Sequence, residues 1–331
     1  MDGIKAVFHG KRPCVSLTLA SISLLGLLGF LAAGCGGTTE STQPMSADQA
    51  AIVGEMESSG LFGTDLTDTS EDEEAAAQAQ AVPYTGVVSL QSLSAEEGTA
   101  ASLPRFWWRG DVNLVQKDID ISIVGDTASV SVTHFLEGTF FIADDVGDTL
   151  VLWGKPFEDT AVRHAQFART PAGWKLTEIS PVDINLTNMD QQTVEITWFG
   201  ALVNGETVWE TDAPDNLFEV PGEIPTFSTG EEVLVEVQVE NSSTSGFNPA
   251  QFVFLHRPGP GLFGKRIRDV MFDDGTNGDI TAGDGIYSRT YTIGPCRGRH
   301  FAAVDVIDSA TFAQLEAPYN STAWGMPYIV Q

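Results

Sequence analysis

The stretch whose residues are best suited to chemistry is Asp273–Ser288, with the sequence DDGTNGDITAGDGIYS. Its four glycines permit backbone conformations that other residues rarely adopt, so the segment can fold back on itself. Ca²⁺ takes roughly six to eight oxygen ligands in proteins, many of them from carboxylate and amide side chains. The segment therefore predicts a Ca²⁺ site. Its candidate ligands are Asp273, Asp274, Asn277, Asp279 and Asp284.

A purely structural loop is the preferred alternative. Asp and Asn side chains bond to nearby backbone amides in turns, whether or not a metal is present. The spacing also differs from that of an EF-hand, which places acids at alternate positions and ends in Glu. Asp305 and Asp308 can complete a site, but their positions predict an exposed strand face and a turn.

Two histidines are candidates for acid–base chemistry. His134 falls on the apolar side of an alternating segment, and His164 lies in a neighbouring strand pattern, with Asp120 or Glu137 as acidic partners. Such a set can move protons near neutral pH. Histidines that fill a core or its rim are the preferred alternative. The chain has no nucleophile elbow, zinc-protease, dithiol, P-loop or dinucleotide signature, which favours a protein that is not an enzyme.

The N-terminal residues predict where the protein resides. Basic residues precede an apolar run over 15–33, and small residues lead into Cys35. These are the parts of a secretory signal. The ending Leu31-Ala-Ala-Gly-Cys35 resembles the lipobox of bacterial lipoproteins, although Ala32 stands where that family prefers Leu. An uncut membrane-spanning anchor is the alternative, because the run is long enough to cross a bilayer.

The lipobox resemblance implies cleavage before Cys35 and acyl chains attached to its sulfur. It also implies a lipid-anchored protein of the bacterial cell envelope, at the periplasmic or surface face of the outer membrane. The net charge of −28 argues against nucleic acid as a partner, since phosphate binding needs clustered basic residues. Envelope proteins or glycans are the expected partners. Only three cysteines are present, so disulfides are not expected to hold the fold.

Four segments are predicted. Residues 1–34 are the lipoprotein signal peptide, and residues 35–82 are an acidic tether without Lys or Arg. A segment so poor in apolar residues is expected to be disordered, apart from a short helix capped by Ser46. Residues 83–182 and 183–331 form two further domains, because a chain of this length usually exceeds one domain.

The domain at 83–182 is predicted to begin with one or two short helices over 93–118, followed by long antiparallel strands. Val130, Val132 and His134 share one face by the two-residue period of a strand. The order of elements, ending in RHAQFARTPAGWKLTEISPV, resembles the NTF2-like (SnoaL-like) α+β cone. That family includes enzymes and binding modules, so the resemblance alone implies neither.

The domain at 183–331 has short alternating segments separated by turn residues, which predicts a β-sandwich. This half resembles bacterial immunoglobulin-like domains, and the DDGxxGDxxAGDGxYS loop recurs in them. The chain is thus predicted to be mainly β. The expected strands are 193–199, 206–210, 233–240, 251–256, 266–272, 286–293, 300–307 and 324–330.

The preferred function is a membrane-anchored envelope lipoprotein that binds or scaffolds without catalysis. The alternative is an enzyme that modifies a small molecule or glycan in the cavity of an NTF2-like domain. Seven tryptophans raise the possibility of a sugar-binding surface, but large aromatic residues in strand patterns usually belong to the core.

Overall fold

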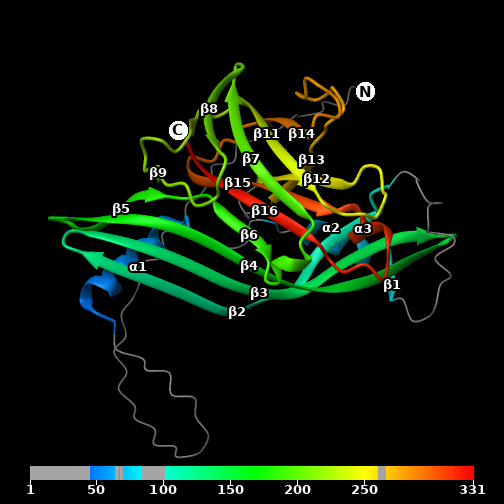
Figure 1. Ribbon diagram of the computed structural model, residues 1–331, viewed down its shortest axis with the longest axis horizontal. Helices are drawn as coiled ribbons and strands as arrows, with labels where there is room; N and C mark the ends of the chain where they lie inside the picture. The colour runs from blue at the N-terminus through cyan, green and yellow to red at the C-terminus, as the bar shows by residue number, and fades with distance from the viewer. Residues whose placement is uncertain (1–44, 64–66, 68–69, 84–100, 260–265) are drawn as a thin grey trace, which may run out of the picture.

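The computed structural model describes residues 45–63, 67, 70–83, 101–259 and 266–331. It is mainly β, with two sheets whose strands pair almost entirely in the antiparallel sense (Figure 1). Among the described residues, no helix has both the length and the apolar character needed to cross a membrane.

Two helices lie in the segment predicted to be a disordered tether. They are α1 (Ala47–Ser59) and α2 (Ser70–Gln78). The predicted cap is present, since Ser46 and Gln49 each accept a hydrogen bond from the backbone amide of the other. Ile52 and Met56 are buried against the rest of the protein, which explains why this part of the acidic segment is ordered.

Three long strands follow, and the first of them covers much of the region expected to be helical; residues 93–100 of that region lie outside the described part of the chain. The strands are β2 (Phe106–Val124), β3 (Thr127–Val146) and β4 (Thr149–Thr170), and they run along the longest axis of the molecule (Figure 1). The helix prediction is wrong for the part of β2 that it covers. Trp107 and Trp108 are both buried, in different apolar clusters, as the alternation of a strand requires.

Glycines lie opposite aromatic residues within these strands. Gly138 is in register with Phe157 and Gly154 with Phe141. A Cβ on Gly138 would lie only 2.7 Å from the Phe157 ring, and one on Gly154 only 2.6 Å from a Thr139 methyl group. Glycine at such positions lets a sheet bend while a neighbouring ring covers the gap.

The larger sheet has its main strands in the order β13-β12-β15-β16-β6-β4-β3-β2. Strand β6 (Val182–Leu186) pairs with β4 on one side and with β16 on the other. The boundary predicted between residues 182 and 183 therefore falls inside a strand that joins the two halves. The other members are β1 (Val82–Pro83), β5 (Gly173–Ile179), β9 (Phe218–Glu219), β10 (Thr226–Phe227), β12 (Gln251–Pro258), β13 (Arg266–Val270), β15 (Gly298–Asp308) and β16 (Ser321–Val330).

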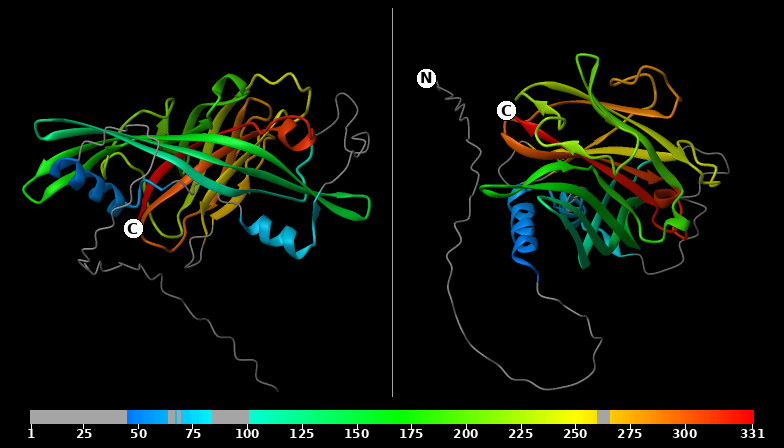
Figure 2. Two further views of the ribbon diagram at one scale, coloured as in Figure 1. Left: turned by 90° about the horizontal axis from the view of Figure 1, so that it is seen from below. Right: turned by 60° about the vertical axis from the view of Figure 1, so that its left-hand side comes forward.

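The smaller sheet has the order β14-β11-β7-β8 and covers one face of the larger sheet (Figures 1 and 2). All eight strands expected over 193–330 are confirmed to within a few residues. The short helices η2 (Met189–Gln191) and α3 (Ser309–Ala313) lie in connections. The strands of the smaller sheet are β7 (Val194–Val203), β8 (Glu206–Thr211), β11 (Glu232–Asn241) and β14 (Ile286–Thr292).

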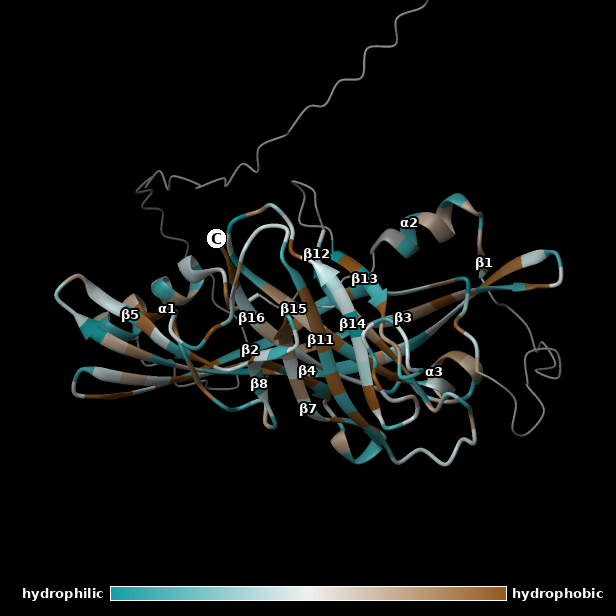
Figure 3. Cartoon of the chain, turned by 90° about the horizontal axis from the view of Figure 1, so that it is seen from above, coloured by the Kyte–Doolittle hydropathy of each residue, from teal (hydrophilic) through white to brown (hydrophobic). Residues whose placement is uncertain are grey.

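Apolar side chains fill the space between the two sheets. On β11 the alternate residues Val233, Val235 and Val237 are fully buried, and hydrophobic and hydrophilic segments alternate along this strand in Figure 3. They pack with Val304 and Val306 of β15 in one cluster. The other face of β15 packs with β3 and β4 in further clusters, so this strand lies between two cores.

Candidate functional site

His134 and His164 lie on opposite faces of the large sheet. His134 is in register with Ala161, whereas His164 is in register with Ser131. Residues 131 and 134 are three apart on β3, so their side chains point to opposite sides. His134 is buried, and burial and the charges of Lys117 and Arg163 lower its pKa. The two histidines therefore cannot act as one acid–base pair, which corrects that expectation.

The carboxylates suggested as partners do not join His134 either. Asp120 is in register with Ser131, which places it on the face of His164. Glu137 is in register with Glu158, an arrangement of like charges across neighbouring strands. The structure thus supplies no acidic partner from this pair to the buried histidine.

A network of charged groups is buried between β2, β12, β15 and β16. Arg109 donates two hydrogen bonds to Asp305, with lengths of 2.8 and 2.9 Å, and its Nε donates to the Tyr319 hydroxyl at 2.9 Å. The Nε2 atom of His256 lies 3.1 Å from Asp305. The Asp305 and His256 side chains are completely buried. Bidentate pairing of this kind is how a carboxylate and a guanidinium remain ionised in a protein interior.

The ionisation of this network is set by burial and by Arg109. Burial raises the pKa of Asp305, but the charge of Arg109 and hydrogen bonds from His256 and Arg109 outweigh it and hold that pKa well below the ordinary value. Burial lowers the pKa of His256, despite its contact with Asp305. At neutral pH the arrangement is therefore an ion pair with a neutral imidazole beside it.

Asp159 is a second buried carboxyl group at the edge of this network. Burial raises its pKa to about 7, even though Arg109 acts in the opposite direction. Its Oδ2 atom lies 3.5 Å from the Tyr319 hydroxyl, and its Oδ1 atom has no hydrogen-bond partner in the part of the chain that the structure describes. Tyr319 in turn shares a 2.5 Å hydrogen bond with the Ser321 hydroxyl. Asp159 is thus a carboxyl group that can exist in either protonation state near neutral pH.

Tyr319 connects the network to a pocket of about 560 Å³. Exposed carboxylates of Asp111, Glu137 and Glu158 line its rim, and Tyr319 is buried in its wall. Asp111 has a φ of 52°, at a point where the register of β2 with β3 shifts. A bulge of this kind changes the direction in which a side chain points. The pocket is suited to a small polar or cationic molecule, because its charged lining is acidic.

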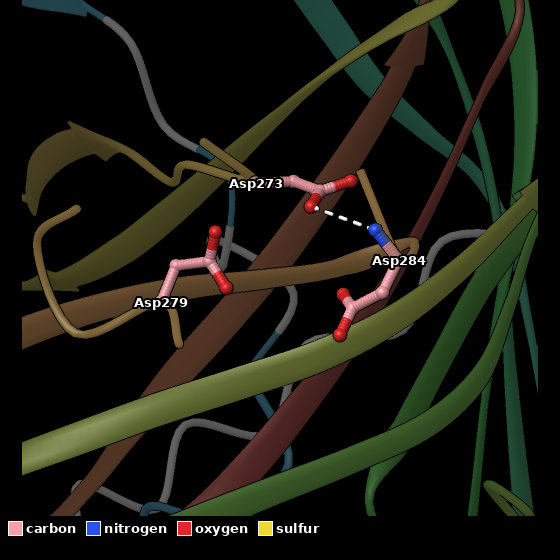
Figure 4. Close-up of side chains that lie close together, drawn as sticks. All are labelled: Asp273, Asp279 and Asp284. Atoms are coloured by element: carbon pink, nitrogen blue, oxygen red, sulfur yellow. Dashed lines mark hydrogen bonds between the residues drawn. The ribbon is translucent and has the colours of Figure 1, made fainter. Parts of the chain in front are cut away.

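The Asp-rich loop brings three of its five predicted ligands together (Figure 4). Carboxylate oxygens of Asp273, Asp279 and Asp284 lie within 4.8 Å of one another. Asp274 and Asn277 instead bond to Thr276, and they are not part of the group of three.

Backbone amides already neutralise part of this charge. Asp273 accepts from the amides of Gly283, Asp284 and Gly285, and Asp279 accepts from those of Gly275 and Thr281. These bonds hold the loop without a metal, as the structural alternative requires. The three carboxylates keep unused lone pairs, so the donor set fits Ca²⁺ in its chemistry.

Removal of Ca²⁺ tests this loop directly. If the ion binds, the midpoint of thermal unfolding should fall by several degrees when a chelator is added, because a ligand of the native state stabilises it by mass action. Asp279→Asn should abolish the difference, while Asp274→Asn should retain it, since Asp274 lies outside the group of three. An unchanged midpoint in the wild type would leave the loop with a structural role alone.

Several residues of the buried network were not anticipated. Asp305 was expected on an exposed face and Asp308 in a turn, but both are buried, and Asp308 caps α3. The local pattern FAAVDVID does contain a signal, because a lone Asp inside an apolar strand requires a partner. That partner, Arg109, is 196 residues away, so its identity could not be read from the sequence.

Two other expectations concern cysteines. Cys35 lies outside the described residues, together with the whole predicted signal peptide. Cys296 is disulfide-bonded, so the expectation of a chain without disulfides is wrong for this residue; the two other cysteines, Cys14 and Cys35, lie outside the described residues.

No family model matches the chain, and no curated protein matches it.

Proposed function

We propose that the protein is a lipid-anchored, non-enzymatic binding protein of the bacterial cell envelope. The observation that supports this proposal is the interior face of β3. His134 has no acid–base partner in His164, and further along the same face an aromatic cluster surrounds Phe140, in which Trp107, Phe254 and Phe312 each lie within 6 Å of another ring. A catalytic cavity in this position would need open space and converging polar groups.

The immunoglobulin-like sandwich is the better supported part of the fold proposal. Four strands pack over β12, β15 and β16 through one shared core. The NTF2-like cone receives support from the long antiparallel strands β3 and β4, but the strand at Phe106–Val124 replaces the helical start on which the resemblance partly depended. The proposed binding surface is the acidic pocket at Tyr319, with envelope proteins or glycans as partners.

The lipid anchor is tested by Cys35→Ser. The wild-type chain should incorporate a labelled fatty acid and sediment with membranes, because several acyl chains hold a protein firmly to a bilayer. The variant should lose the label and most of its membrane association. Cys296→Ser is the matched control and should keep both.

Mass spectrometry of the mature N-terminus can reveal the result that would contradict the anchor. A sulfur that carries a thioether-linked acyl group cannot also form a disulfide. Cleavage before Cys35 would also remove Cys14, so a disulfide that persists at Cys296 within the mature chain would require Cys35. Such a bond in the purified protein, or an intact Met1, would therefore contradict the anchor.

The enzyme alternative is supported by a different group from the histidines. Asp159, with its pKa raised to about 7, contacts Tyr319 in the pocket wall. Carboxyl groups with raised pKa values act as general acids in active sites. An enzymatic activity toward glycans or small molecules would depend on this pair. If the wild type shows such an activity and Asp159→Asn folds but lacks it, the result would favour the enzyme alternative.

The raised pKa of Asp159 also predicts a pH dependence of stability. Its pKa is about 7 in the folded protein, against 3.8 ordinarily, so the folded state binds more protons between these values. The stabilisation that the protonated Asp159 gives the folded state is therefore complete below pH 4 and is lost as the pH rises through 7. The free energy of unfolding of Asp159→Asn, relative to that of the wild type, should therefore increase by on the order of a few kcal/mol from pH 4 to pH 8.

Urea unfolding of both proteins over this pH range measures the difference. Asp183, whose pKa burial raises to about 6, contributes equally to both and cancels. A difference that does not change with pH would show that Asp159 titrates normally in the folded protein.

A further inference from the structure

Arg163 of β4 is a guanidinium enclosed by apolar groups. Only 3 % of the surface of Arg163 is exposed. Nη1 donates a hydrogen bond to the Leu61 carbonyl oxygen, and the Phe301 ring centroid lies 4.4 Å from Cζ. Leu61 and Phe301 belong to the apolar cluster that covers this face of the large sheet.

One edge of this guanidinium has no hydrogen-bond partner among the described residues. Both Nε and Nη2 are buried there without an acceptor. These two nitrogens lie on the same edge of the planar group, and that edge binds carboxylate or phosphate through two parallel hydrogen bonds. The Arg109 side chain is 6 % exposed, and Asp305 accepts hydrogen bonds from both its Nη1 and its Nη2.

No counter-ion compensates the charge of Arg163 within the described parts of the chain. Burial alone lowers its pKa to about 9, with no acidic group acting against it. The groups that interact with this part of the face are basic, because Lys117 is in register with His134, and the charges of Lys117 and Arg163 both lower the pKa of His134. A buried charge without a partner is costly, so the native structure gains if an anion occupies the edge.

The surroundings indicate what kind of anion fits. A phosphate dianion needs more donors than one edge of Arg163 supplies, whereas a carboxylate needs two and neutralises one positive charge. The apolar cluster around the guanidinium favours a ligand with an apolar body. The segment Ala47–Leu61 covers the site, and Asp48 ties its start to Arg169 and Trp174.

We propose that the Nε–Nη2 edge of Arg163 binds the carboxylate of an apolar molecule, of the class of medium-chain fatty acids, between β4 and the segment Ala47–Leu61. This site is separate from the acidic pocket at Tyr319 and does not depend on the lipid anchor. It gives an acidic protein one interior position that is selective for an anion.

Thermal unfolding of the purified full chain with octanoate tests the proposal. The wild-type midpoint should rise by several degrees, and the rise should increase with octanoate concentration. Octanol, which has the chain without the charge, and inorganic phosphate should produce no rise. Arg105→Met, at a half-exposed arginine whose ion pair is with Asp145 and not with the covering segment, should retain the response.

Two replacements of Arg163 identify the site. Arg163→Met removes the unpartnered charge, so it should melt no lower than wild type without ligand and should not respond to octanoate. Arg163→Lys keeps the charge but lacks the fork, and it should bind octanoate at least tenfold more weakly. An equal rise in Arg163→Met, an equal rise with octanol, a rise with phosphate alone, or no rise in wild type would each overturn the proposal.

Discussion

Asp305→Ala is expected to lower the free energy of unfolding at pH 7 by about 3–5 kcal/mol, because it leaves Arg109 buried without its counter-charge. The two side chains are 0 % and 6 % exposed, so water cannot replace the missing carboxylate. His256 would lose its hydrogen bond to Asp305 at the same time. Urea unfolding followed by tryptophan fluorescence measures the change.

The exposed ion pair Arg105–Asp145 supplies the control. Its partners lie 3.2 Å apart but are about half exposed. Exposed pairs contribute about 0–1 kcal/mol, so Asp145→Ala should change stability little.

Replacement of both buried partners distinguishes a missing counter-charge from a missing contact. The variant Arg109→Met with Asp305→Leu should recover much of the lost stability, because it removes both charges from the interior. If Asp305→Ala cost no more than Asp145→Ala, the pair could not be a buried ion pair.

The strands of the C-terminal half could be predicted because each is short and bounded by turn residues. The Asn204-Gly205 turn is an example, since both residues have positive φ and join β7 to β8. The N-terminal half was harder to predict. Trp107 and Trp108 are compatible with a helix or a strand, and only their burial on opposite faces of a sheet decides between the two.

The candidate sites divide in the same way. Asp273, Asp279 and Asp284 are close in the sequence, so their proximity could be expected from loop chemistry. The pairing of Arg109 with Asp305, and the unpartnered edge of Arg163, depend on which strands become neighbours. Register alone also decides that His134 and His164 face apart. Sequence periodicity assigns a residue to a face of its own strand, but not to a face shared with another strand.

The aromatic cluster beside the ion pair should be as sensitive as the pair itself. Phe140 is completely buried, and its ring lies 5.4 Å from Trp107, 5.6 Å from Phe312 and 5.1 Å from Tyr319. Phe140→Ala is expected to cost about 3–5 kcal/mol, since it removes a large side chain and leaves a cavity that close-packed neighbours cannot fill.

Phe140→Leu keeps more of the packed volume and should cost distinctly less. Val124→Ala, at a position that is 74 % exposed, should change stability by about 0.5 kcal/mol or less. Equal costs for the two Phe140 variants would indicate that packing volume is not what the ring contributes. Because the Phe140 ring also supports Tyr319, the alanine variant should loosen the pocket wall, and ligand binding there should weaken before the protein unfolds.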